Sequence, residues 1–222
     1  MDMRQLQKSM LFRGMTEPEI TKALQALEAH EKHYEKGETL LTAGSITGRM
    51  GLVLEGSVTI ESNDAWGNRT IISHIGCGQV FAETYALLEN EPMLVDVMAS
   101  EDCRILFLRS GRIQSLQNSP NPWALKYITN LLTISMHKNL ILSGWSFHTA
   151  PKTIRGRVMA YLNSVSLQRG SGEFGIPFAR QQLADYLNLE RSALSKELGK
   201  MQREGLIFCR KNHFVIRQFS TV

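Results

Sequence analysis

The stretch from Arg180 to Ile207, RQQLADYLNLERSALSKELGKMQREGLI, predicts two short amphipathic helices joined by a tight turn. The first helix repeats apolar residues at helical spacing, namely Leu183, Ala184 and Leu187. Asn188 suits the turn because asparagine tolerates positive φ. The second helix starts near Arg191 and directs three apolar residues inward, Leu194, Leu198 and Met201. This is the pattern of a helix-turn-helix.

The second helix is unusually polar on its other side. Short donors and long cations near its N-terminus suit base reading in the major groove, and they are Arg191, Ser192, Ser195 and Lys196. After Gly205, two β-prone runs at 206–209 and 214–216 flank a polar turn, which predicts a hairpin directly after the helix. The segment is therefore a candidate winged helix. Candidate phosphate contacts are Arg180, Gln181, Arg210, Lys211 and His213.

Charge is divided unevenly along the 222 residues. Residues 1–149 hold 13 Lys and Arg against 16 Asp and Glu, a net charge of −3. Residues 150–222 hold 12 against 5, a net charge of +7, and the two parts give the overall +4. A basic last third attached to an acidic remainder indicates a polyanion-binding domain joined to a domain of another kind.

The region before position 110 has a different pattern. An N-terminal helical segment, with Thr16 and Glu19 as a capping box, extends to near Tyr34. Short β-like runs separated by glycines then predict a small rolled antiparallel sheet, with strands at 38–41, 50–54, 57–60, 70–75 and 104–108. The fold class is therefore α+β. We expect an effector-sensing β-roll at 1–120, a long helix within 121–149 and a winged helix at 150–222.

The long helix, expected from about Pro122 to Phe147, is apolar on two sides. One stripe contains Ile128, Leu132, Met136 and Leu140. The other runs at roughly heptad spacing through Tyr127, Leu131, Ile134, Lys138, Ile141 and Trp145. A helix lying on a sheet needs one apolar face, so the second stripe predicts a parallel partner helix and a homodimer. The alternative is a helix enclosed within its own subunit.

Several classes of protein are disfavoured. No apolar run approaches the length of a membrane span and the N-terminus lacks the apolar core of a signal peptide, so we expect a cytoplasmic protein. Cys77, Cys103 and Cys209 are widely spaced and form no thiolate metal motif. For an enzyme, the best available groups are Glu28 and His30 with His33, or His74 near Cys77, and neither set forms a catalytic constellation. We expect no enzyme activity, metal or resident cofactor.

The order of these elements resembles the family of the cyclic-AMP receptor protein and the fumarate–nitrate regulator, bacterial transcription factors. The resemblance covers nearly the whole chain and rests on three segments and the long helix: KGETLLTAGSITGRMGLVLEGSVTI (36–60), GQVFAETYALLENEP (78–92) and ADYLNLERSALSKELGKMQREGLI (184–207). It implies a jelly-roll-like effector domain, a dimerising helix and a winged helix that binds two-fold operators in double-stranded DNA. Contacts with RNA polymerase are frequent in such proteins. The effector region would include Glu83, Thr84, Tyr85, Met93 and Leu94.

The chain departs from the resemblance in residues that would bind the effector and in one residue that would contact the operator. Members that bind cyclic nucleotides have Gly-Glu and Arg-Ser where this chain has Ala82-Glu83 and Met93-Leu94. Without the arginine a buried phosphate would have no counter-ion, so we expect an effector other than cyclic AMP. The cysteines of oxygen-sensing members and the haem ligands of carbon monoxide-sensing members are also absent. Ser192 replaces a glutamate that accepts from cytosine in many members, so the operator should differ there.

The sequence thus predicts a homodimeric, sequence-specific DNA-binding transcriptional regulator with an unidentified small-molecule effector. Two alternatives stay open. One is a regulator of the same fold that responds through its thiols, or through a metal bound by His30 and His33, which would share one face of a helix. The other is a ligand-binding module whose winged helix no longer binds DNA.

Overall fold

The computed structural model describes residues 2–63, 69–88, 90–110 and 121–217. The chain forms two compact units that divide between Ser135 and Met136, within the long helix. Antiparallel sheets and helices occur in both units, which confirms the α+β class. Within the described part of the chain, no helix has the length and apolarity required to cross a bilayer.

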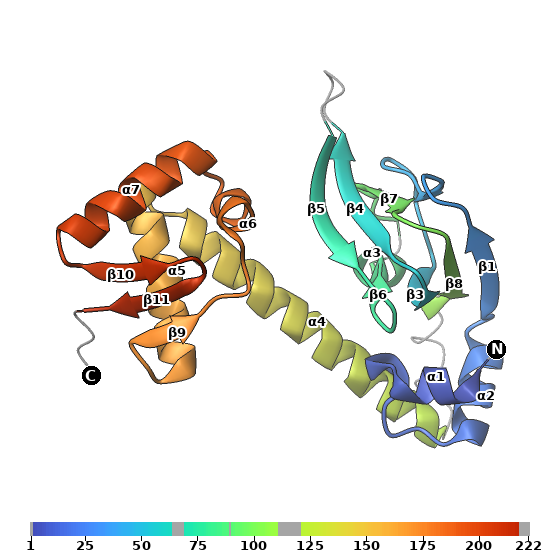
Figure 1. The fold of residues 1–222 in the computed structure, drawn as a ribbon. Coiled ribbons are helices and arrows are strands. Elements are labelled where there is room, and N and C mark those ends of the chain that lie inside the picture. Colours follow the sequence, from blue (N-terminus) through green and yellow to red (C-terminus); the bar gives the residue numbers. More distant parts are fainter. Residues whose placement is uncertain (1, 64–68, 89, 111–120, 218–222) are drawn as a thin grey trace. The chain divides into compact units, whose positions relative to one another are not determined.

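The first unit begins with short helices, of which Figure 1 labels the first and the last. These are α1 (Met3–Lys8), the 3-10 helix η1 (Met10–Phe12) and α2 (Glu17–Ala26). The predicted capping box starts α2: the backbone N–H of Thr16 donates to Glu19 Oε2 at 2.8 Å, and the backbone N–H of Glu19 donates to Thr16 Oγ1 at 3.4 Å. Because this signal depends only on neighbouring residues, the sequence alone could reveal it.

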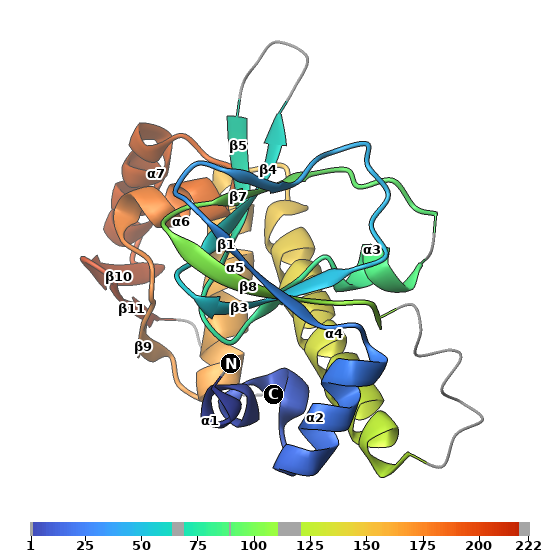
Figure 2. The same ribbon diagram turned by 90° about the vertical axis from the view of Figure 1, so that its right-hand side faces the viewer.

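Two four-stranded antiparallel sheets form the roll, in the orders β1-β8-β3-β6 and β2-β7-β4-β5 (Figure 2). The strands are β1 (His30–Tyr34), β2 (Thr39–Leu41), β3 (Met50–Glu55), β4 (Val58–Asn63), β5 (Arg69–Ile75), β6 (Val80–Phe81), β7 (Asp96–Ala99) and β8 (Cys103–Leu108). The short helix α3 (Glu83–Leu87) follows β6. All five predicted strands are present within a few residues of their expected bounds. Strands β1, β6 and β7 were not predicted.

The sheet that contains β3 is buried on both faces. Met50, Leu52 and Leu54 pack against the helices, whereas Val53 packs in the core between the two sheets. Gly51 also belongs to β3, and a Cβ built there would lie 2.1 Å from Phe81 Cζ. Strand β8 alternates in the same way, so its residues also contribute to two cores.

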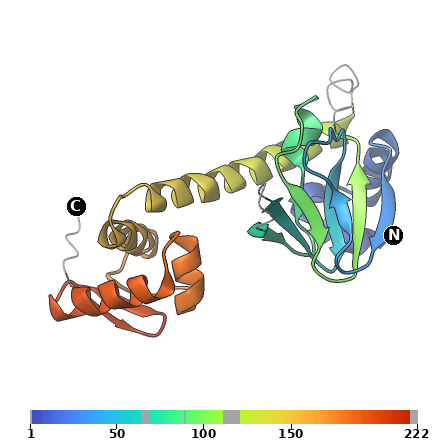
Figure 3. The same ribbon diagram turned by 90° about the horizontal axis from the view of Figure 1, so that it is seen from above.

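Helix α4 (Pro122–Thr149) is continuous and slightly longer than predicted (Figure 3). Its first half packs into the core shared by the N-terminal helices and the β3 sheet, through Trp123, Tyr127, Leu131 and Ile134. The assignment of Leu131 and Ile134 to a dimer seam is therefore wrong, because only 4 % and 8 % of these residues are exposed. The other stripe, formed by Ile128, Leu132, Met136 and Leu140, is exposed along its length. Ile141 and Trp145, from the second half of the predicted seam, are exposed as well.

The second unit has a winged helix. Its predicted elements are the helices α6 (Arg180–Tyr186) and α7 (Arg191–Arg203) and the hairpin strands β10 (Ile207–Arg210) and β11 (His213–Ile216). It also contains helix α5 (Ile154–Arg169) and strand β9 (Glu173–Gly175), and this strand was not predicted. The sheet has the order β10-β11-β9, all antiparallel. Leu183, Leu194 and Leu198 are buried in its core, as the apolar periodicity predicted.

Candidate nucleic-acid interface and effector region

The turn between α6 and α7 has the conformation expected from its sequence. Asn188 has φ of 51°, in the left-handed region that asparagine tolerates. Arg157 of α5 holds this turn: its Nη1 donates to Leu187 O at 3.1 Å and Asn188 O at 3.0 Å, and its Nε donates to Pro151 O at 2.9 Å. The two bonds to Leu187 and Asn188 satisfy carbonyls at the end of α6, and the bond to Pro151 ties the same side chain to the segment before α5. The sequence did not reveal this role of Arg157, because its partners in the turn are 30 and 31 residues away.

A second arginine of α5 holds α7, the second helix of the predicted helix-turn-helix. Arg155 forms ion pairs with Glu197 and Glu204, each at 2.7 Å. The paired guanidinium lowers the pKa of Glu204, and the two carboxylates raise the pKa of Arg155. The ion pairs lie on the side of α7 that faces its own unit, which leaves the opposite side for a partner.

The predicted base-reading residues occupy the first two turns of α7. Arg191, Ser192, Ser195 and Lys196 are all exposed. Glu190 caps the helix, since its carboxylate accepts from the backbone N–H of Ser192 at 3.3 Å and also from the Ser192 hydroxyl. Arg191, Ser195 and Lys196 are therefore open to solvent, whereas the Ser192 hydroxyl donates a hydrogen bond to Glu190.

The predicted phosphate contacts divide into two groups. Arg210 and Lys211 are exposed at the tip of the β10–β11 hairpin, where Lys211 has φ of 57°. Arg180 lies instead against the hairpin, with its guanidinium carbon 5.9 Å from the centre of the Phe214 ring and Nη2 donating to Lys211 O at 3.3 Å. Gln181 donates to Asp185 at 2.8 Å. A hollow of about 510 Å³ lies between the start of α6 and the hairpin and is lined in part by Arg180 and Lys211.

The last turn of α4 is anchored to the winged helix. Trp145 Nε1 donates to Tyr186 O at 2.9 Å. The buried His148 ring is 2.9 Å from the Tyr186 hydroxyl through Nδ1 and 2.9 Å from the Ser164 hydroxyl through Nε2. Burial lowers the pKa of His148 and raises the pKa of Tyr186. Trp145, predicted as a seam residue, thus supports α6 within its own unit.

The predicted effector residues lie at α3 and the segment before β7. Ala82 precedes α3 with φ of 59°, and Glu83 is buried at the start of the helix. Met93 belongs to the core between the two sheets and is 2 % exposed, whereas Leu94 is 78 % exposed. The Tyr85 hydroxyl accepts from Leu94 N at 3.3 Å. Glu83, Tyr85 and Met93 are therefore buried or half-buried, while Thr84 faces solvent.

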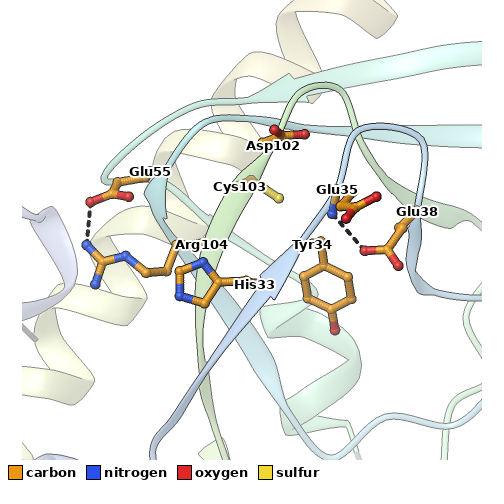
Figure 4. A pocket seen from close by; sticks show the side chains of 8 residues that line it. All are labelled: His33, Tyr34, Glu35, Glu38, Glu55, Asp102, Cys103 and Arg104. Atoms are coloured by element: carbon orange, nitrogen blue, oxygen red, sulfur yellow. Dashed lines mark hydrogen bonds and ion pairs between the residues drawn. The ribbon is translucent and has the colours of Figure 1, made fainter.

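A cavity of about 480 Å³ opens elsewhere on the roll, where β1, β3 and β8 meet (Figure 4). Three of its carboxylates have partners: Glu38 accepts from Glu35 N at 2.7 Å, Asp102 accepts from Lys36 N at 2.9 Å, and Glu55 pairs with Arg104. Cys103 lines the same cavity, and burial raises the pKa of its thiol. Reactive cysteines need a lowered thiol pKa, so Cys103 gives no support to the thiol-responsive alternative.

The metal-responsive alternative depended on His30 and His33 sharing one face of a helix, and that prediction is wrong. His30 and His33 lie in strand β1 and not on a helix, so their spacing of three directs them to opposite faces. His30 stacks on Phe107, with ring centres 5.5 Å apart. Among the described residues, no group of three His, Cys, Asp or Glu side chains could hold a metal ion.

Comparison with known proteins finds relatives along most of the chain. The cyclic nucleotide-binding domain family matches residues 31–119, and the Crp-like helix-turn-helix domain family matches 156–221, so the two matches together cover more than half of the chain. The chain is 22 % identical over 191 residues to the cAMP-activated global transcriptional regulator CRP of Haemophilus influenzae, covering 84 % of each chain. It is 20 % identical over 200 residues to the transcriptional activator protein FnrL of Cereibacter sphaeroides, covering 85 % of this chain and 77 % of that protein.

Solved structures share the fold. The c-di-GMP responsive global regulator CLP of Xanthomonas campestris has a TM-score of 0.57 and 20 % identity, with 93 % of this chain and all of that chain covered. The catabolite activator protein of Thermus thermophilus has a TM-score of 0.50 and 23 % identity, with 95 % and 94 % covered. From the two domain matches and these relatives, the chain belongs to the Crp/Fnr family of DNA-binding transcriptional regulators.

Proposed function

We propose that this protein is a homodimer that regulates transcription in the cytoplasm by binding a two-fold operator through α7 and the β10–β11 hairpin. Its roll would sense an effector other than cyclic AMP. The observation that carries the proposal is the exposed set of donors on the first turns of α7, namely Arg191, Ser195 and Lys196. Contacts with RNA polymerase would follow at some promoters, as the family resemblance implies.

One side of α7 packs against its own unit and the opposite side is exposed, which supports specific binding to DNA. Buried packing and the Arg155 ion pairs hold α7 from one side, so the opposite side can enter a major groove without rearranging the core. Arg191 is long enough to reach a guanine edge, whereas Arg210 and Lys211 at the hairpin tip suit phosphates. The net charge of +7 in residues 150–222 adds attraction to the backbone.

An exposed apolar stripe on α4 supports the homodimer. Leu132, Met136 and Leu140 are 55 %, 56 % and 69 % exposed, and Ile128 extends the stripe at 37 %. Their spacing of four residues keeps them close to one face of a helix. Ile141 is 68 % exposed beside this stripe and stays in the proposed seam with Lys138, while Leu131 and Ile134 leave it. A second copy of α4 would remove this area from water.

The apolar environment of Met93 supports an effector that lacks a buried phosphate. A phosphate placed there would meet a thioether and the ring of Tyr85, without the arginine that the cyclic-nucleotide-binding members supply. The relatives named above are described as cAMP-activated and as c-di-GMP responsive, so effectors differ between them. The effector would act by shifting the population of dimers whose two recognition helices match half-sites about one helical turn apart.

The test begins with selection of duplexes from a random DNA pool by the purified protein. We expect a two-fold consensus and a protein–DNA complex that contains two chains, measured by sedimentation velocity. Affinity for the selected duplex should fall steeply with salt and stay well above affinity for random DNA. A protein that selects no consensus and binds no duplex at low salt would be a module that no longer acts on DNA.

A further inference from the structure

The recognition helix begins with a carboxylate whose position is fixed by a neighbouring hydroxyl. Glu190 precedes the first residue of α7, and its carboxylate accepts from both the backbone N–H and the hydroxyl of Ser192. These hydrogen bonds lower the pKa of Glu190, so the group is charged at neutral pH. Both residues are exposed on the side of the helix that also carries Arg191 and Ser195.

The charge of Glu190 restricts what it can contact in a DNA complex. A phosphate would repel it, so its favourable partners in the interface are the amino groups at base edges. The Ser192 hydroxyl donates its one hydrogen bond to the carboxylate, which leaves it only acceptor capacity towards DNA. Glu190 and Ser192 together therefore present acceptors and no donor.

An acceptor-only group distinguishes between the two bases that carry a major-groove amino group. Cytosine presents N4 as a donor with no acceptor beside it, whereas adenine presents N6 next to the acceptor N7. The adenine edge suits a side chain with both a donor and an acceptor, such as an amide. The cytosine edge suits a carboxylate.

We propose that Glu190, held in place by Ser192, is a specificity-determining residue that reads a cytosine in each operator half-site. The inference rests on the proposed DNA-binding function. Glu190 would accept a hydrogen bond from a base, in addition to its ordinary function of capping α7. Ser192 acts as the positioning residue of the pair.

The experiment compares the duplexes selected from a random pool by three forms of the full chain. Glu190→Ser removes the carboxylate but keeps a good N-cap, so α7 should remain folded. Glu173→Gln is the charge control, because it removes one exposed carboxylate from β9 of the same unit. For the unaltered protein and for Glu173→Gln we expect the same C·G preference at one position per half-site. Glu190→Ser should lose roughly tenfold in discrimination at that position alone.

The outcomes separate the inference from the function on which it rests. Unchanged base preference in Glu190→Ser, with normal affinity, would show that Glu190 only caps α7 and would overturn the inference. Ser192→Ala checks the positioning role: a loss of discrimination smaller than that of Glu190→Ser is expected, and no change would remove Ser192 from the pair. Failure of all forms, including the unaltered protein, to select any sequence would count against the proposed function itself.

Discussion

The winged helix and the roll differ in where they hold the residues that their functions would use. In the winged helix, Arg191 and Lys196 stand on the surface, and other residues of α7 supply the core. In the roll, Met93 occupies a position of the proposed effector region and is at the same time part of the core between the sheets. Operator preference can therefore change by surface substitutions with little effect on folding, whereas a change of effector is also a change of core packing.

Of the variants considered, Met93→Arg should cause the largest change, which is a loss of stability in the roll. Placing a charge in the core between the sheets should lower the free energy of unfolding of the roll by about 3–5 kcal/mol, measured by urea denaturation. Leu94→Arg is the matched control, because 78 % of Leu94 is exposed and the same charge should change stability by less than about 0.5 kcal/mol. Equal stability of the two variants would mean that Met93 is not a core residue. If millimolar cyclic AMP restored the stability of Met93→Arg alone, the region would have kept the shape of a nucleotide site.

Alanine substitutions at two apolar residues of α4 should show which residues stabilise the core of the first unit and which stabilise the dimer. Ile134→Ala leaves a cavity in the first unit and should destabilise it by about 2–5 kcal/mol. Leu140→Ala, at an exposed position, should leave that unit's unfolding unchanged but shift the dimer towards monomer in sedimentation velocity. An unaltered dimer in Leu140→Ala combined with Leu132→Ala would place the dimer contact somewhere other than this stripe.

Substitutions at Arg191 and Lys211 should distinguish base-specific contacts of the winged helix from its attraction to DNA phosphates. Arg191→Ala should cost about 1–3 kcal/mol of binding free energy on the selected operator and little on random DNA. Lys211→Ala should weaken both and reduce the slope of log affinity against log salt by about one. Titration of labelled duplexes at several salt concentrations measures both quantities. Equal losses on specific and random DNA for Arg191→Ala would reject its reading role.

The smallest expected effect is the contribution of His148 to the pH dependence of stability. Because its pKa is lowered by burial, the folded unit binds fewer protons than the unfolded chain below pH 6.5. The contribution of His148 to stability is therefore complete above pH 6.5 and is lost as the pH falls towards the lower, folded-state pKa. The carboxylates with lowered pKa act below about pH 4.5, so unfolding measured between pH 7.5 and 5 isolates the histidine. His148→Gln, which does not titrate, should remove this part of the pH dependence, and an identical profile would contradict the assignment.

Local signals in the sequence predicted local structure well. Thr16 with Glu19 predicted the start of α2, and Asn188 predicted the turn before α7, because each depends on residues a few positions apart. The exposed side of α7 also followed from apolar periodicity, since three buried leucine and methionine positions define the opposite face.

Features that depend on distant partners were not predictable in the same way. Strand β1, HEKHY, has little apolar alternation and exists because it pairs with β8, more than 60 residues away. Periodicity revealed two apolar stripes on α4 but could not say which one packs against the chain's own core. Arg157 resembled any surface cation, although three backbone carbonyls depend on it.

The division of α4 between two units limits how this protein could exchange parts with its relatives. A recombination junction after the helix, at Ala150, would transfer a winged helix without Trp145 and His148, and it would leave the hydroxyls of Ser164 and Tyr186 without their histidine. A junction before the helix would strip Tyr127 and Leu131 from the roll. A viable chimaera must therefore join inside α4, near Ser135, where the crossover preserves helical phase and each unit keeps its own anchors.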